Sequence, residues 1–78
     1  MSRNFLVIHS TLAMAAQLVD ARRYAEATLC YQAALVRMRA AGAKKELIDD
    51  ARALVRDCRK AAKKQVAAAI ATPRGLMN

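Results

Sequence analysis

The sequence contains very little of what interrupts a helix or builds a β-sheet. Its 78 residues include two glycines, one proline, one phenylalanine, two tyrosines and no tryptophan. No run alternates apolar and polar residues, and alanine, which strands disfavour, occurs throughout the chain. These absences exclude a β-rich fold, and the chain is too short for more than one domain. The sequence therefore predicts a single all-α domain.

Residue patterns that carry catalysis or bind metals are also missing. Cys30 and Cys58 are far apart in the chain, and the one histidine, His9, is remote from both, so no zinc-ligand spacing exists. His9 precedes Ser10 and Thr11, but adjacent residues on a helix do not face each other. We therefore expect no enzymatic activity, no cofactor and no metal. The cysteines are expected to be buried free thiols, with a disulfide as the alternative in an exported protein.

Long hydrophobic runs are absent as well. No segment reaches the roughly 20 consecutive apolar residues that a membrane-spanning helix needs. The apolar run from Phe5 to Ile8 is followed by three polar residues, which interrupt the pattern of a secretory signal. We therefore expect a cytoplasmic protein with no membrane span.

Positive charge and alanine are what the chain has in excess. Fourteen lysines and arginines face six acidic residues, giving a net charge of +8, which favours nucleic acid, an anionic membrane surface or an acidic protein as partner. Apolar residues make up 56% of the chain but aromatics only 4%, and alanine buries little area per side chain. A core this small gains stability when a second chain covers one of its faces. A protein partner with an acidic surface is expected, and self-association into a homo-oligomer is a further expectation.

The two glycines, Gly42 and Gly75, and the one proline, Pro73, mark the places where helices are expected to end. The spacing of apolar residues predicts a first helix from about Asn4 to Ala21. It predicts a second helix from about Tyr24 to Ala40, with Gly42 as a left-handed cap. These two helices form an antiparallel hairpin.

A third helix is expected to start near residues 43–45 and to end at about Thr72, because the residue before a proline disfavours helix. It would be roughly 40 Å long, against roughly 25 Å for each of the first two helices. The predicted architecture is a helical hairpin plus a longer third helix, as a three-helix bundle over residues 1–72. The alternative is an open arrangement that another chain completes. Residues 73–78 are expected to be a flexible tail.

Each predicted helix has an apolar face for the core. On the first two helices these faces comprise Phe5, Ile8, Leu12, Ala15, Ala16 and Val19, and then Ala27, Cys30, Tyr31, Ala34, Leu35 and Met38. On the third helix the face comprises Leu47, Ile48, Ala51, Leu54, Val55, Cys58, Ala62, Val66 and Ala69. Val7, Met14 and Leu18 add a second apolar strip to the first helix, which belongs either to a wide core face or to a partner interface.

The stretch DARRYAEATLCYQAAL resembles the turn and second helix of a tetratricopeptide repeat. The matching residues are Tyr24, Ala27, Tyr31, Ala34 and Leu35, preceded by Met14, Ala15 and Leu18 at compatible positions. The departures are Thr11 for a tryptophan, Arg22 for a glycine in the turn and Arg39 for a closing proline. The same residues are similar to a microtubule-interacting-and-trafficking domain. Either resemblance implies a scaffold that docks a peptide or helix in a groove, without enzymatic activity.

Four cations of the third helix fall within about 60° of each other at 100° per residue. We call Arg52, Arg56, Arg59 and Lys63 the basic stripe. The stripe is suited to an acidic partner or to phosphates, and a solvated face is the third interpretation. Aromatics for base stacking are absent from this helix, so base-specific reading is not expected.

The function expected is that of a small helical protein–protein interaction module: an adaptor, an inhibitor or a chaperone-like subunit. The alternative is a non-specific nucleic-acid-binding protein that uses the basic third helix. The residues expected to contact the partner are Val7, Met14, Leu18, Arg52, Arg56, Arg59, Lys63, Val66 and Ile70.

Overall fold

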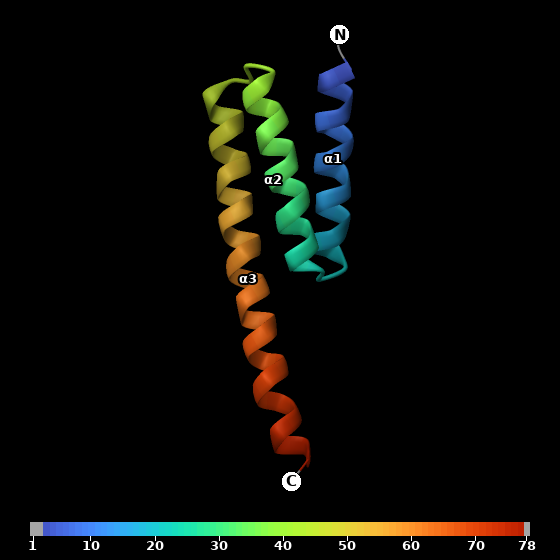
Figure 1. The fold of residues 1–78 in the computed structure, drawn as a ribbon, viewed down its shortest axis with the longest axis vertical. Coiled ribbons are helices and arrows are strands. Elements are labelled where there is room, and N and C mark those ends of the chain that lie inside the picture. Colours follow the sequence, from blue (N-terminus) through green and yellow to red (C-terminus); the bar gives the residue numbers. More distant parts are fainter. Residues whose placement is uncertain (1–2, 78) are drawn as a thin grey trace.

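The computed structural model describes the backbone of residues 3–77 and the side chains of residues 5–70, and it consists of three α-helices (Figure 1). These are α1 (Arg3–Asp20), α2 (Tyr24–Ala40) and α3 (Lys45–Met77). Helix α2 packs against both α1 and α3, whereas α1 and α3 make far fewer contacts with each other. Successive helices run antiparallel, and the molecule is elongated, with extents of 58 × 19 × 14 Å. The predicted all-α fold, a helical hairpin plus a longer third helix in a three-helix bundle, is confirmed.

Helices α1 and α2 end in the same kind of turn. Arg22 follows α1 with φ 62°, and Gly42 follows α2 with φ 72°. In each turn, the N–H of this residue and that of the next donate to carbonyls three and five residues earlier, at 2.8–3.1 Å. This pair of bonds is a Schellman motif, which satisfies the last carbonyls of the helix. Arg22 therefore adopts the conformation that glycine ordinarily supplies, and the chain reverses without one.

Small side chains let the helices of the hairpin approach closely. Ala15 of α1 and Ala27 and Ala34 of α2 have no exposed surface. Tyr31 and Val55 are also buried and extend this core towards α3. No large side chain of the described residues is completely buried, so the hydrophobic gain per residue is modest.

Some residues predicted for the core lie on the surface instead. Phe5 is 69% exposed, because it lies about 80° of helical rotation from Ala15, which marks the buried side of α1. Leu47 and Leu54 are 52% and 40% exposed, because α3 has one main neighbour and buries only a narrow strip. Ala16, Val66 and Ala69 are exposed as well.

Helix α3 continues through Pro73 to Met77, so the predicted end near Thr72 is wrong. A proline removes one backbone hydrogen bond, while the alanine-rich segment before it strongly favours helix. The assignment of residues 73–78 to a flexible tail stays a prediction. None of the three helices, as far as the structure describes them, has the length and apolar character needed to cross a membrane.

Both cysteines are free thiols, as expected, but only one of them is fully inside. Cys58 is buried in the core cluster, and Cys30 is half-buried at its edge. Burial raises the pKa of the Cys58 thiol, and the nearby negative charge of Asp57 adds to this effect. A thiol with a raised pKa is a poor nucleophile, so Cys58 serves as a small core residue.

Candidate functional site

Helix α2 is apolar on the side that faces solvent. Leu29 and Val36 are 66% and 65% exposed, and their spacing of seven residues places them on the same face, two turns apart. Three exposed alanines lie within about 40° of Leu29 at 100° per residue. We call Ala25, Leu29, Ala33, Val36 and Ala40 the outer face of α2. A helix that is apolar on two opposite sides is normally covered on both of them.

A groove of about 510 Å³ lies between α2 and α3. Its α2 wall consists of Gln32 and Leu35. Its α3 wall consists of Asp49, Arg52, Ala53, Val55, Arg56 and Arg59. Gln32 lies about 60° of helical rotation from Leu29, so the groove adjoins the outer face of α2. The groove therefore combines apolar side chains from both helices with three arginines on one wall.

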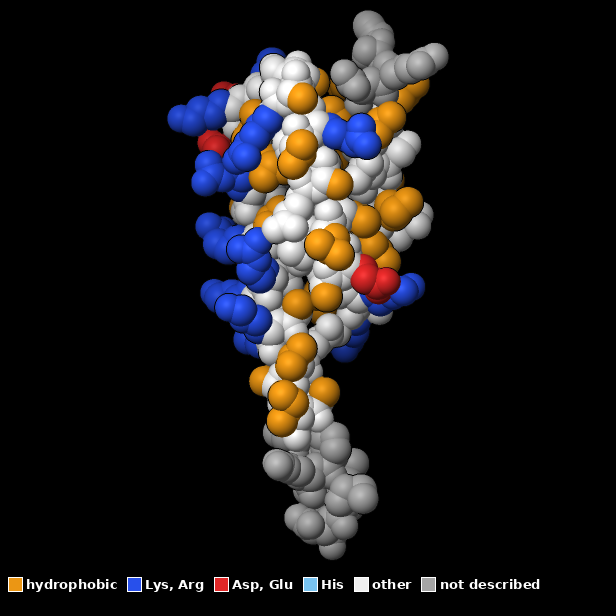
Figure 2. All heavy atoms as spheres, viewed as in Figure 1, with side chains coloured by type: hydrophobic (Ala, Val, Ile, Leu, Met, Phe, Trp, Pro, Cys, Tyr) orange, Lys and Arg blue, Asp and Glu red, His pale blue; other side chains and the backbone are white. Residues whose placement is uncertain are grey.

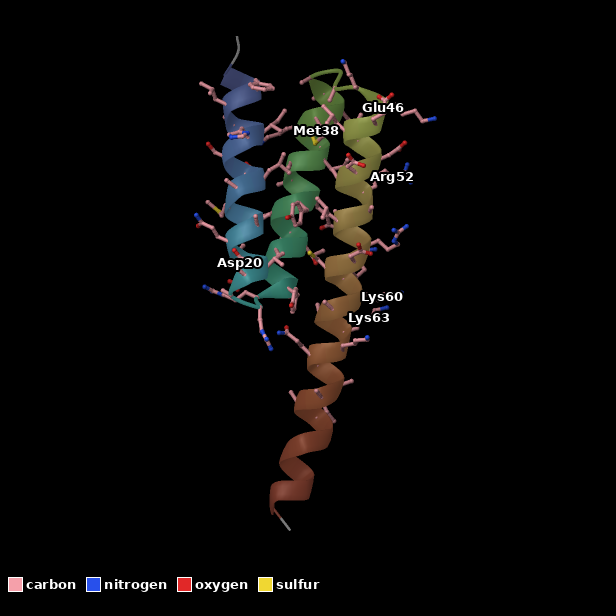
Figure 3. The ribbon with its side chains drawn as sticks, turned by 180° about the vertical axis from the view of Figure 1, so that it is seen from behind. Asp20, Met38, Glu46, Arg52, Lys60 and Lys63 are labelled. Carbon is pink, nitrogen blue, oxygen red and sulfur yellow. The ribbon has the colours of Figure 1, made fainter. Side chains whose placement is uncertain are left out.

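The positive charge of the basic stripe is almost uncompensated. Arg56 pairs with Asp57 at 3.6 Å, but both side chains are largely exposed, and such surface pairs are weak. Within residues 5–70, Arg52, Arg59 and Lys63 take part in no ion pair. Figure 2 shows blue side chains gathered along the α3 edge of this face, beside orange side chains over α2. Arg52 and Lys63 lie on the edge of α3 that is turned away from α1 (Figure 3).

The far end of α3 projects beyond the hairpin (Figure 1). Gln65 Nε2 donates a hydrogen bond to the carbonyl of Arg22 in the α1–α2 turn, at 2.6 Å. We call residues 66–77 the overhang. Val66 and Ile70, both on it, are 59% and 63% exposed. By helical rotation they share a sector of about 80° with the basic stripe.

The structure thus brings together most of the residues predicted to contact a partner. Four charged and two apolar residues form one continuous strip of α3: Arg52, Arg56, Arg59, Lys63, Val66 and Ile70. On α1, Val7 and Met14 are 38% and 56% exposed and belong to a different helix from this strip. Leu18 is half-buried and packs against the core cluster, so it contributes to the hairpin itself.

Sequence reasoning missed Leu29 and Val36. The apolar face predicted for the second helix accounted for its inward residues and left these two unexplained. Their seven-residue spacing, with alanines between them, was the available signal. The apolar residues of α2 lie on two opposite sides of the helix, so their average direction does not reveal the outward-facing group.

The described residues contain no group of three or more histidine, cysteine or acidic side chains placed to hold a metal ion. The two raised pKa values, those of Tyr31 and Cys58, belong to core residues and arise first from burial. Neither of these two residues belongs to the outer face of α2 or to the basic stripe.

The chain was also compared with known proteins. No match was found among protein-family models, curated proteins or solved structures.

Proposed function

We propose that this chain is a small protein–protein interaction module that acts as an adaptor, an inhibitor or a chaperone-like subunit. The observation that carries the proposal is the outer face of α2, an apolar surface beside a basic stripe whose charge is almost uncompensated. The fully buried alanines of the hairpin support the resemblance to a tetratricopeptide or microtubule-interacting hairpin, since both use small residues at the helix contact. In this proposal the hairpin is the scaffold and its outward surface binds.

The free energy for binding comes mainly from apolar burial. Covering a Leu or Val side chain stabilises by about 1.5–3 kcal/mol relative to leaving it exposed. The basic stripe adds long-range attraction, which raises the association rate for an acidic partner and favours one orientation. Apolar contacts therefore set the lifetime of the complex, and charge sets its selectivity.

Affinity capture from the native cell, with nuclease added, tests this proposal. The matched bait is a Leu29→Glu/Val36→Glu double variant, which is expected to fold because both positions are exposed. The expected result is one or more proteins that the wild-type chain retains in the presence of nuclease and the double variant loses. Equal capture by both baits, with unchanged circular dichroism, would show that the outer face of α2 does not bind.

Non-specific nucleic-acid binding is the second candidate, and the four clustered cations of the basic stripe support it. Each phosphate contact contributes roughly −0.9 to the slope of log K against log salt concentration on duplex DNA. A stripe that tracks phosphates would therefore give a slope near −3 to −4. Replacing all four cations by glutamine would then abolish this salt dependence. A slope near zero, or one that the substitutions leave unchanged, would exclude this use of the stripe.

A further inference from the structure

We propose that two copies of this chain associate through α3, which pairs in the antiparallel direction with α3 of the second copy. The contact lies on the side of α3 that carries Leu47 and Leu54, and not in the groove beside α2. It leaves the outer face of α2 and the basic stripe free, so the association goes beyond the proposed function. The second copy is identified by the order of the charges along α3.

The apolar part of the contact is a row of residues spaced seven apart. Leu47, Leu54, Ala61 and Ala68 follow one another at this spacing. Both leucines are exposed, because α1 makes few contacts with α3 and does not cover them. A seven-residue repeat of apolar side chains stays on the contact side when two helices supercoil around each other. The row is therefore suited to a second helix that lies along α3.

Charged side chains flank this row on one side. We call Glu46, Asp50, Asp57, Lys60 and Lys64 the charged edge of α3. At 100° per residue they lie within about 80° of each other, and the three acidic residues lie about 40–80° from Leu54. All five are exposed, and only Asp57 takes part in an ion pair within residues 5–70, with its neighbour Arg56. The other four charges thus have no opposite charge within the described part of the chain.

The charged edge changes sign along the helix. Its three acidic residues come first, between Glu46 and Asp57, and the lysines Lys60 and Lys64 follow. Figure 3 shows Glu46 near the start of α3 and Lys60 farther along it. Parallel pairing would place acid against acid, whereas antiparallel pairing places the acidic part of each copy against the lysines of the other. Such a surface is complementary to itself, as a twofold-symmetric dimer requires.

The charges also give the register of the pair. Glu46 and Lys64 lie nine residues before and after Val55, and Asp50 and Lys60 lie five residues before and after it. Antiparallel helices that cross at Val55 therefore place Glu46 opposite Lys64 of the second copy. The same crossing places Asp50 opposite Lys60 of the second copy. Twofold symmetry repeats both contacts, which gives four pairs of opposite charge.

The supported part of α3 has the same midpoint. The helix begins at Lys45, and Gln65, which is bonded to the turn between α1 and α2, lies twenty residues farther on. Val55 is halfway between them. In this register the supported parts of both copies, roughly 30 Å each, lie side by side over their whole length. Leu54 meets Leu54 of the second copy beside the crossing, and the two overhangs project in opposite directions.

The positive net charge lies mostly away from this contact. Each copy has a net charge of +8, but the charged edge, with three acidic residues and two lysines, has a charge of −1. The basic stripe is about 140–180° of helical rotation from Leu54, on the opposite side of a helix about 10 Å across. Salt screens charges over roughly 8 Å at physiological ionic strength. The stripes of two copies therefore repel each other only weakly, whereas the charged edge would repel nucleic acid or an acidic protein.

Sedimentation equilibrium of the full chain measures the association. The mass is expected to rise from 8.5 kDa towards twice that value as the concentration approaches about 1 mM. Leu54→Lys, beside the crossing, should keep the chain monomeric, whereas Leu29→Lys, at an exposed leucine of α2, should leave the dimer unchanged. Circular dichroism checks that both variants fold. A wild-type chain that stays monomeric, or a Leu54→Lys variant that dimerises equally well, would overturn the proposal.

Two charge-reversal variants test the pairing. Glu46→Lys/Asp50→Lys and Lys60→Glu/Lys64→Glu each place like charges opposite one another, so neither should dimerise alone. Mixed in equal amounts, they should form a heterodimer, because each of the four facing positions then combines opposite charges. A mixture that remains monomeric, while the wild-type chain dimerises, would show that the charged edge does not form the contact.

A matched variant separates the charged edge from net charge. Lys60→Glu/Lys64→Glu lowers the net charge from +8 to +4, and Arg52→Glu/Lys63→Glu lowers it equally on the opposite side of α3. The first should be monomeric, and the second should dimerise at least as well as the wild-type chain. If both dimerised more strongly than the wild-type chain, association would follow net charge alone and the proposal would fail.

A spin label determines the direction of the pair. A nitroxide is attached to Ala67→Cys, an exposed position off the charged edge, in a chain with Cys30 and Cys58 replaced by alanine. Mixed with isotope-labelled chain, it should broaden the amide signals of residues 43–46 of the labelled copy. Broadening around residue 67 instead would indicate a parallel pair and contradict the proposal. The capture experiment with Leu29→Glu/Val36→Glu does not involve this edge, so its result decides the proposed function separately.

Discussion

The side chain of Gln65 is bonded to the backbone carbonyl of Arg22, 43 residues earlier, with 2.6 Å between Nε2 and the oxygen. This bond joins the middle of α3 to the turn between α1 and α2, although neither residue belongs to the apolar core. The turn between α1 and α2 lies at the end of the hairpin, and α3 projects beyond it (Figure 1). Gln65 therefore ties α3 to the turn of the hairpin.

Replacing Gln65 by alanine is expected to lower the free energy of unfolding by about 0.5–1.5 kcal/mol, the usual net contribution of one hydrogen bond. Chemical denaturation followed by circular dichroism measures it. Gln17→Ala is the matched control, because Gln17 is an exposed helical residue that makes no side-chain hydrogen bond in the described structure. Both changes give the same gain in helix propensity. Equal effects of the two would show that the bond to Arg22 contributes nothing.

The two helix-ending turns should respond oppositely to a change of residue. Arg22→Gly is expected to stabilise by up to about 1 kcal/mol, because a non-glycine residue at positive φ is strained. Gly42→Ala should destabilise by about 1 kcal/mol for the same reason. An added Cβ at Gly42 meets no atom within 4 Å, so its cost would come from the backbone alone. Thermal unfolding of both variants checks the pair, and a stabilising Gly42→Ala would refute the argument.

Enlarging a buried alanine should be costly. Ala27 has no exposed surface and lies where α1 and α2 approach each other. Ala27→Leu is expected to destabilise by about 1–3 kcal/mol, because the inserted atoms force the helices apart. Ala25→Leu, at an exposed position of the same helix, should have little effect in a denaturation experiment. A tolerated leucine at residue 27 would mean that the hairpin is loosely packed.

Tyr31 should make the fold sensitive to alkali. Burial raises the pKa of its phenol, and the negative charges of Cys58 and Asp20 add to this. The unfolded chain therefore loses the proton at a lower pH than the native chain does. The stabilisation is complete below the ordinary tyrosine pKa of 10.0 and decreases as pH rises through the higher native value.

Denaturation midpoints measured at increasing alkaline pH test this contribution. Tyr31→Phe should flatten the decrease, since it removes the titrating group and keeps the ring. Cys58 contributes in the same direction from pH 9.0 upward, so the comparison is best made in a Cys58→Ser background. An unchanged alkaline decrease in Tyr31→Phe would assign the effect to other groups.

Local sequence signals determined much of the fold. Gly42 and the polar break before Tyr24 located the two turns, and the bounds of α2 agree with those predicted. The spacing of Ala15, Ala27 and Ala34 indicated the buried contacts of the hairpin, because small residues recur where helices meet.

The misplaced residues share a physical cause. Periodicity gives the direction of a side chain on its helix, but not how many neighbouring helices cover that direction. Leu54 lies next to the buried side of α3 but is 40% exposed, because α1 lies too far away to cover it. Leu29 and Val36 are exposed because α2 packs against α1 and α3 only, and no helix covers its outer face.

The point at which Gln65 meets the turn divides α3 into two parts with different expected rates of amide hydrogen exchange. Amides before it are protected by α2 and should exchange only when the hairpin opens. Those of residues 66–70 have no neighbouring helix, and a helix segment this short is marginal in water on its own. They should therefore exchange much faster, although the helix is continuous across the boundary. A molecule that covers Val66 and Ile70 would slow this exchange, so isotope uptake by five consecutive amides would report its binding.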